Sequence, residues 1–163
     1  MRKIERITEM KNLVICTVFF CALFFCAECF AFNCRISTTP VSFGTYDVFS
    51  GYVLDSTGTI TVSCSNPEKK PMPITISLSS GSSGTFTPRQ MKSTNSNDRL
   101  NYYLFSDPAR NVIWGDGTGG SSRVSMIVTR DSTANALIYG RILPGQNVSV
   151  GNYSDVLTAT VLW

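Results

Sequence analysis

Histidine is absent from the 163 residues of this chain. Serine–histidine–aspartate and cysteine–histidine catalysis both need an imidazole to carry a proton, so these two catalytic arrangements are excluded. The aspartates are scattered over turn-like stretches, where their usual role is to accept hydrogen bonds from nearby backbone amides. No carboxylate pair has a spacing that favours a glycosidase. We therefore expect a protein without catalytic residues and without a cofactor.

Clustered positive charge is missing as well. Beyond residue 31 the chain carries ten basic and eight acidic side chains, with no block of basic residues. Binding to nucleic acid is driven by such blocks, so no nucleic-acid partner is expected. The same part of the chain also lacks an apolar period of 3.6 residues, and this predicts a minimal helix content.

The first 31 residues have a composition of their own. Residues 1–12 hold four basic side chains, and residues 13–27 form an uncharged, largely apolar run. A basic stretch before a short apolar core describes a secretory signal peptide, because the core is short for a membrane span. Cleavage is predicted after Ala31, with Cys29 and Ala31 as the small residues at the cleavage site. We predict a signal peptide over 1–31 and one exported domain over 32–163; an uncleaved membrane anchor is the alternative.

Removal of the signal peptide leaves two of the six cysteines, Cys34 and Cys64. Two cysteines in an exported chain are expected to form a disulfide. The disulfide would close a loop of about 31 residues and stabilise the fold by roughly 3.5–4 kcal/mol in the chain-entropy model. No metal site is expected, because two thiolates without a histidine cannot supply four ligands.

The exported part has the pattern of short strands separated by polar turns. Strands are predicted at 34–46 with a break at Pro40, and at 59–64, 73–78, 100–105, 123–129, 136–142 and 156–163. Residues 89–98 are interpreted as a surface stretch. This order predicts an all-β antiparallel sandwich of immunoglobulin-like type. The expected inward side chains are Phe43, Ile60, Val62, Ile74, Ile76, Leu78, Leu104, Ile127, Ile138, Leu157 and Val161.

One motif resembles a nucleotide-binding loop. Residues 115–120 fit the pattern GxGxxG. A dinucleotide site needs a helix N-terminus after the loop to receive the pyrophosphate. Residues 121–129 are strand-like, so we interpret the motif as a hairpin loop.

The final segment, 156–163, raises a question about its neighbours. Apolar side chains lie on both of its faces, namely Leu157, Ala159, Val161 and Trp163 on one and Val156 and Leu162 on the other. This pattern predicts a strand that is buried on both sides. Such a strand needs a neighbour on each edge, and no later segment follows to supply the second.

Several short motifs together resemble the spore coat protein U domain family, which also builds the subunits of archaic chaperone–usher pili of the Csu type. The motifs are Cys34 with Phe43-Gly44-Thr45-Tyr46; residues 60–64; residues 100–105 followed by Trp114-Gly115; Tyr139-Gly140-Arg141-Ile142 with Pro144-Gly145-Gln146; and Gly151-x-Tyr153-x-Asp155 before the last strand. The resemblance covers essentially all of the exported part, in the order of the family.

The resemblance implies an incomplete immunoglobulin-like sandwich that lacks its last strand and is completed by a donor strand. The implied partners are a periplasmic pilus chaperone, an outer-membrane usher and a neighbouring pilus subunit that donates the strand. The implied location is the periplasm and then the cell surface. The acceptor groove would be lined by Ile36, Val41, Phe43, Leu157, Ala159, Val161 and Trp163. An isolated subunit should expose apolar core and aggregate.

One departure from the family pattern bears on the place of this chain in a fibre. A polymerising subunit carries alternating apolar residues before its first cysteine, whereas cleavage after Ala31 would leave only Phe32 and Asn33 before Cys34. A tip-like or terminal subunit is therefore expected. Two alternatives are a secreted spore-coat or matrix protein and a self-contained extracellular module that binds carbohydrate through Tyr102, Tyr103 and Trp114.

Overall fold

The computed structural model describes residues 33–65, 70–129 and 132–163. The predicted signal peptide and its cleavage site at Ala31 lie outside these ranges. In the described ranges no helix has the length and apolar character needed to cross a membrane.

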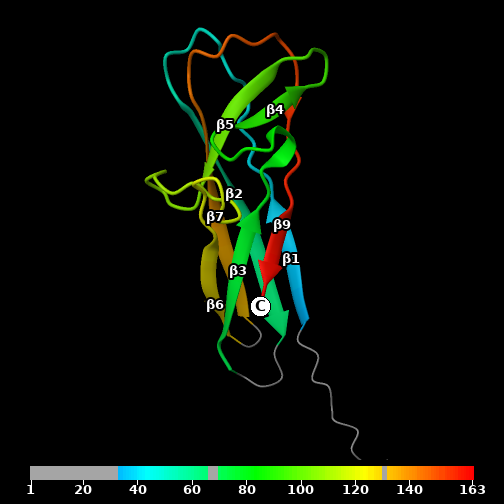
Figure 1. The fold of residues 1–163 in the computed structure, drawn as a ribbon, viewed down its shortest axis with the longest axis vertical. Helices are drawn as coiled ribbons and strands as arrows, with labels where there is room; N and C mark the ends of the chain where they lie inside the picture. The colour runs from blue at the N-terminus through cyan, green and yellow to red at the C-terminus, as the bar shows by residue number, and fades with distance from the viewer. Residues whose placement is uncertain (1–32, 66–69, 130–131) are drawn as a thin grey trace, which may run out of the picture. The chain divides into compact units, whose positions relative to one another are not determined.

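The described residues form two antiparallel β-sheets and contain no α-helix (Figure 1). The strands are β1 (Asn33–Thr39), β2 (Leu54–Ser65), β3 (Met72–Leu78), β4 (Arg89–Ser93), β5 (Arg99–Phe105), β6 (Val124–Val128), β7 (Ser132–Ile142), β8 (Tyr153–Ser154) and β9 (Ala159–Leu162), with one 3-10 turn, η1 (Gly81–Ser83). The larger sheet has the order β1-β2-β7-β5-β4-β8, and the smaller one has the order β6-β3-β9. The predicted all-β sandwich is confirmed.

The core lies between the central strands of the two sheets. Strand β2 directs Ile60 and Val62 inward, and strand β3 directs Ile74 and Ile76 inward, and all four side chains are almost completely buried. Side chains alternate between the two faces of a strand, so the alternating pattern in the sequence places one apolar row inside. Full burial of a side chain of this size stabilises the fold by roughly 1.5–3 kcal/mol.

The stretch 89–98, interpreted above as surface, contains strand β4 and the most deeply buried charge among the described residues. Arg89 is 0% exposed. Its guanidinium donates hydrogen bonds to the carbonyl of Ser79 at 3.0 and 3.2 Å and to the carbonyl of Trp114 at 2.7 Å, and it lies over the ring of Phe86. Burial lowers the pKa of Arg89. The prediction is wrong for the start of the stretch, where Arg89 and Met91 are buried, whereas 92–98 are exposed or half-buried. A polar side chain that binds buried carbonyls resembles a surface residue in the sequence.

The sequence suggested a strand that resumes after Pro40, but the segment after Pro40 does not continue strand β1. Strand β1 ends at Thr39, and residues 40–46 form no ladder. Val41 and Phe43 instead pack onto two glycines of the larger sheet. A Cβ on Gly58 would lie 2.8 Å from Val41, and a Cβ on Gly140 would lie 2.7 Å from Phe43. These glycines form a notch that holds the segment against the inner face of the sheet.

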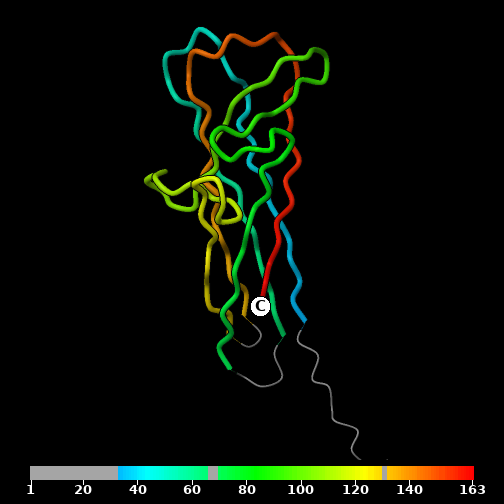
Figure 2. Tube along the Cα trace, in the orientation of Figure 1, coloured from blue at the N-terminus to red at the C-terminus, as the bar shows by residue number. Residues whose placement is uncertain are grey.

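The segment then joins a second loop at one end of the domain (Figure 2). The hydroxyl of Tyr46 donates a hydrogen bond to the carbonyl of Leu143 and accepts one from the backbone N–H of Gln146 at 2.9 Å. Two loops almost one hundred positions apart in the sequence are thereby fixed to each other.

Two further expectations are corrected by the structure. Ile127 was expected in the core, but it is 68% exposed, because Val124, Met126 and Val128 are the inward residues of β6. A shift of one residue in the assumed alternation moves every side chain to the opposite face. The glycine-rich loop 115–120 is followed by strand β6 and not by a helix, so it lacks the helix N-terminus that a pyrophosphate would need.

Candidate strand-binding groove

Strands β1 and β9 are the terminal strands of the two sheets. In the described part of the chain, β1 is hydrogen-bonded to β2 alone, and β9 is hydrogen-bonded to β3 alone. Both strands lie on the same side of the sandwich (Figure 1), where residues of each line one cavity. Each strand therefore has one edge whose backbone donors and acceptors are free for another strand.

The cavity between these edges is a groove with a volume of about 310 Å³. Its first wall is formed by Thr38, Thr39, Pro40, Val41 and Phe43, and its second wall by Tyr153, Ser154, Asp155, Leu157 and Ala159. The floor is formed by core side chains of both sheets, namely Ile60, Leu78, Met91, Tyr102, Leu104 and Ile138. A long, largely apolar groove flanked by two free strand edges has the features of a site for strand addition.

The inner face of β1 is also uncovered beyond the end of this groove, at Ile36, which does not line the cavity. Ile36 lies directly opposite Val62 in the β1–β2 ladder, so both side chains point to the same face of the sheet. Val62 is 0% exposed, whereas Ile36 is 39% exposed. Every residue of β1 except Cys34 is exposed. The strand therefore has backbone partners on one edge but no side-chain layer above it.

The final segment has the same incomplete burial. Leu157, Ala159 and Val161 face inward, but Val156 is 86% exposed and Leu162 is 56% exposed. The expected strand buried on both faces is thus wrong, because no described element covers the outer face of β9. The ladder itself is also shorter than expected and covers Ala159–Leu162 only.

The seven residues predicted to line an acceptor groove lie at different depths. Val41, Phe43, Leu157 and Ala159 line the cavity described above. Val161 is 7% exposed and belongs to the core. Ile36 and Trp163 are outside the cavity lining, with exposed fractions of 39% and 58%.

One end of the groove is polar, which the predicted set of groove residues did not include. Asp155 lines the groove and accepts a hydrogen bond from the hydroxyl of Tyr102 at 2.7 Å and another from the backbone N–H of Ser82 at 2.9 Å. Burial, and then the hydrogen bond to Asp155, raise the pKa of Tyr102. The ring of Phe43 meets that of Tyr102 edge to face at 6.2 Å. In the sequence, Asp155 had been interpreted as one turn aspartate among several.

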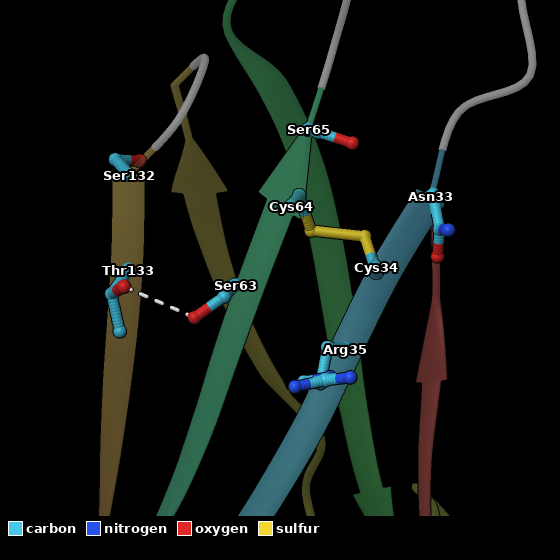
Figure 3. Close-up of a pocket in the computed structure, with 8 residues that line it drawn as sticks. All are labelled: Asn33, Cys34, Arg35, Ser63, Cys64, Ser65, Ser132 and Thr133. Atoms are coloured by element: carbon cyan, nitrogen blue, oxygen red, sulfur yellow. Dashed lines mark hydrogen bonds between the residues drawn. A yellow bond between two sulfur atoms is a disulfide. The ribbon is translucent and has the colours of Figure 1, made fainter.

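The predicted disulfide between Cys34 and Cys64 is confirmed, and it joins directly opposite residues of β1 and β2 (Figure 3). Beside it lies a second hollow, lined by polar residues of β1, β2 and β7. Ser63 and Thr133 form a hydrogen bond of 3.0 Å across it, and among the described residues that line it Arg35 is the charged one. Both cysteines are oxidised, so neither of them offers a free thiol in this hollow.

The aromatic residues considered for carbohydrate binding do not form an exposed platform. Trp114 is 0% exposed, and its indole N–H donates to the carbonyl of Ile76. Tyr102 is 4% exposed. Tyr103 is half-buried and stacks on Phe105. Likewise, no group of three or more potential metal ligands occurs in the ranges that the structure describes.

Comparison with known proteins gives two kinds of match. The model of the Spore Coat Protein U domain matches residues 21–160. Protein U of Myxococcus xanthus is 29% identical over 128 residues, which are 74% of this chain and 70% of that protein.

The second kind of match is to a solved structure. A chain from the crystal structure of the CsuC–CsuE chaperone–tip adhesion subunit pre-assembly complex, from archaic chaperone–usher Csu pili of Acinetobacter baumannii, superposes with a TM-score of 0.58 and 25% identity. The match covers 82% of this chain but only 40% of the other, so this chain spans less than half of that neighbour.

Proposed function

The chain belongs to the Spore Coat Protein U domain family, and from that premise we propose that it is a structural subunit of an archaic chaperone–usher pilus. In this proposal the subunit is exported to the periplasm and ends at the cell surface. The observation that carries it is the difference in exposure between Ile36 and its cross-strand partner Val62. A complete sandwich would cover both side chains.

The proposed mechanism is strand addition. A strand from another chain enters between β1 and β9 and forms hydrogen bonds with their free edges. Its inward side chains then cover Val41, Leu157 and Ala159, which line the groove. Each apolar side chain that becomes fully buried contributes roughly 1.5–3 kcal/mol.

The proposed partners follow from this mechanism. A periplasmic chaperone supplies the first strand, which keeps the groove covered while the subunit travels to an outer-membrane usher. A neighbouring subunit then supplies the strand that remains in the fibre. The similarity to a chain of the Csu pre-assembly complex supports this order of events.

We further propose a tip-like or terminal position in the fibre. This proposal depends on the predicted cleavage after Ala31, which would leave two residues before Cys34. Intact-mass measurement of the exported protein tests it directly. A mature chain that begins well before residue 32 and donates its N-terminal segment to a second subunit would favour a repeating position.

The groove is tested by co-expression in a bacterial periplasm with and without the candidate chaperone, followed by size-exclusion chromatography. We expect a one-to-one complex with the chaperone, and aggregation or proteolysis of the subunit alone. Ala159→Arg places a bulky cation in the groove wall and should abolish the complex. Thr160→Arg, on the exposed face of the same strand, is the matched control and should leave the complex intact. A soluble, sharply melting monomer without chaperone would refute the open groove.

A spore-coat or matrix protein is the second candidate function, and the similarity to Protein U favours it. The same fold and export would serve such a role. Genes for a chaperone and an usher next to the gene for this chain would support the pilus. Recovery of the chain from an outer coat in cells that lack these genes would support the coat protein.

A further inference from the structure

The polar end of the groove restricts the strand that can occupy it. We infer that the incoming strand carries a hydrogen-bond-donating side chain at the position that meets Asp155. This inference rests on the proposed role of the groove as a strand acceptor. The rest of the groove selects alternating apolar side chains, and this end selects a hydroxyl, amide or ammonium group. Asp155 is therefore a specificity-determining residue of the proposed site.

The carboxylate of Asp155 is held in a fixed orientation at the groove wall. Its Oδ1 accepts the backbone N–H groups of Ser82 at 2.9 Å and of Val156 at 3.0 Å, and its Oδ2 accepts the hydroxyl of Tyr102 at 2.7 Å. A Cβ on Gly81 would collide with Oδ2, so the glycine makes room for the carboxylate. With these contacts the carboxylate cannot rotate away when a strand arrives.

The negative charge of Asp155 is not paired inside the domain. Among the described residues Asp155 forms no salt bridge. The nearby buried cation, Arg89, interacts with it electrostatically but donates its hydrogen bonds to the carbonyls of Ser79 and Trp114. Within the described ranges Oδ2 accepts one hydrogen bond, and a carboxylate oxygen has room for a second.

The surroundings of Oδ2 differ between the empty groove and the filled groove. Asp155 is half-buried, so part of this residue is open to water in the empty groove. A strand that covers the groove removes this water. If the covering side chain is apolar, a charged acceptor is left without its partner, and affinity falls by about tenfold or more. A donor group on the incoming strand replaces the water and avoids this loss.

The test uses the oxidised chain, refolded from denaturant in the presence of a synthetic peptide of about ten residues, the length of a typical strand. In the parent peptide, valine alternates with serine. A series then replaces each valine in turn with threonine, which has nearly the same shape but carries a hydroxyl in place of one methyl group. Dissociation constants are measured by competition against a fluorescent copy of the parent.

At one position we expect threonine to bind about tenfold more tightly than valine. At the other inward positions threonine should bind more weakly, because the groove there is apolar. Asp155→Ala should abolish the advantage at the one position. Asp155→Asn, which keeps the shape of the side chain and serves if the alanine variant does not fold, should reduce the advantage severalfold.

The possible failures are distinguishable. Peptides that bind without any preference for threonine, or with a preference that both variants leave unchanged, would contradict the role of Asp155 while the groove itself stands. If no peptide of the series binds and no chaperone complex forms, the proposed acceptor function fails as well.

Discussion

Strands β1 and β2 are neighbours in one ladder, yet they are buried very differently. Val62 and Ile60 of β2 are 0% exposed, while Ile36 of β1, on the same face of the sheet, is 39% exposed. Strand β2 has a sheet above it and a strand on each edge, whereas β1 has a strand on one edge only. Burial here is decided by what lies across the sandwich, and less by the pattern within the strand.

This difference divides the domain into two parts. We call one part complete, because its strands have all their neighbours within the chain. We call the other part conditional, because its burial depends on a strand from another chain. The centre, built on β2, β3 and β7, has its full set of neighbours. The edge strands β1 and β9 have half of theirs. Changes in the centre should therefore affect the free subunit, and changes at the edges should matter mainly when the groove is filled.

The largest expected effect concerns the disulfide, which attaches the conditional strand β1 to the complete strand β2. Cys34 and Cys64 are 30 positions apart, and the cross-link restricts the unfolded chain. Replacement of both by serine should lower the free energy of unfolding by about 3–4 kcal/mol. Urea denaturation measures this loss at a protein concentration low enough to keep the free subunit from aggregating, and reduction of the parent chain should give the same value. A loss below about 1 kcal/mol would show that β1 contributes little to the free subunit.

Single substitutions in β1 and β2 should have smaller effects on the free energy of unfolding, and these effects should differ between the two strands. Ile60→Ala removes a completely buried side chain and should lower the free energy of unfolding by about 3 kcal/mol. Ile36→Ala on β1 should cost less than about 1 kcal/mol, because surface and partly exposed positions contribute little. The same pair measured in the strand-filled complex should differ less, since Ile36 is then covered. Equal losses in the free subunit would contradict the division drawn above.

The smallest effect concerns the outer face of the complete part. Asp55 of β2 forms two hydrogen bonds of 2.8 Å with Arg141 of β7 and lies 3.3 Å from Arg110. The hydrogen bond from Arg141, followed by the charge of Arg110, lowers the pKa of Asp55. The resulting stability is present above the unfolded pKa of about 3.9 and is lost as the pH falls through the lower folded value.

This pair is partly exposed to solvent, so its contribution should stay below about 1 kcal/mol. Asp55→Asn should lower the free energy of unfolding by that amount at neutral pH, and by less at pH 3, which lies below the unfolded pKa, so that part of the contribution is already lost. Thermal denaturation at both pH values gives the comparison. A loss that is independent of pH would mean that packing, and not charge, is responsible.

The sequence predicted the complete part of the domain better than the conditional part. The alternation of Ile60, Val62 and Cys64, and that of Ile74, Ile76 and Leu78, identified β2 and β3 because both strands are half-buried in a regular way. The edge strands could not be identified from such a regular, half-buried pattern. The segment after Pro40 has the composition of a strand but packs onto Gly58 and Gly140 without a ladder, and only tertiary contacts decide this.

The candidate site could be predicted only in its apolar part. The resemblance to the family assigned Val41, Phe43, Leu157 and Ala159 to the groove walls, and all four line the cavity. The polar end depends on Asp155 meeting Tyr102, which is 53 positions earlier in the sequence. Nothing in the local pattern of either residue predicts that contact, nor the buried position of Arg89.

The pairing of β2 with β7 also limits how early the domain can fold during synthesis. Leu54 is paired with Ile142, so the middle of the larger sheet cannot close before most of the chain is present. Strand β3 likewise cannot pair with β9 until β9 has been synthesised, since Leu78 pairs with Ala159. A polypeptide that emerges with its N-terminus first must therefore hold its early apolar strands open until its last residues arrive. Contacts between such distant segments form slowly, and throughout this delay the nascent chain is exposed to aggregation and to proteases.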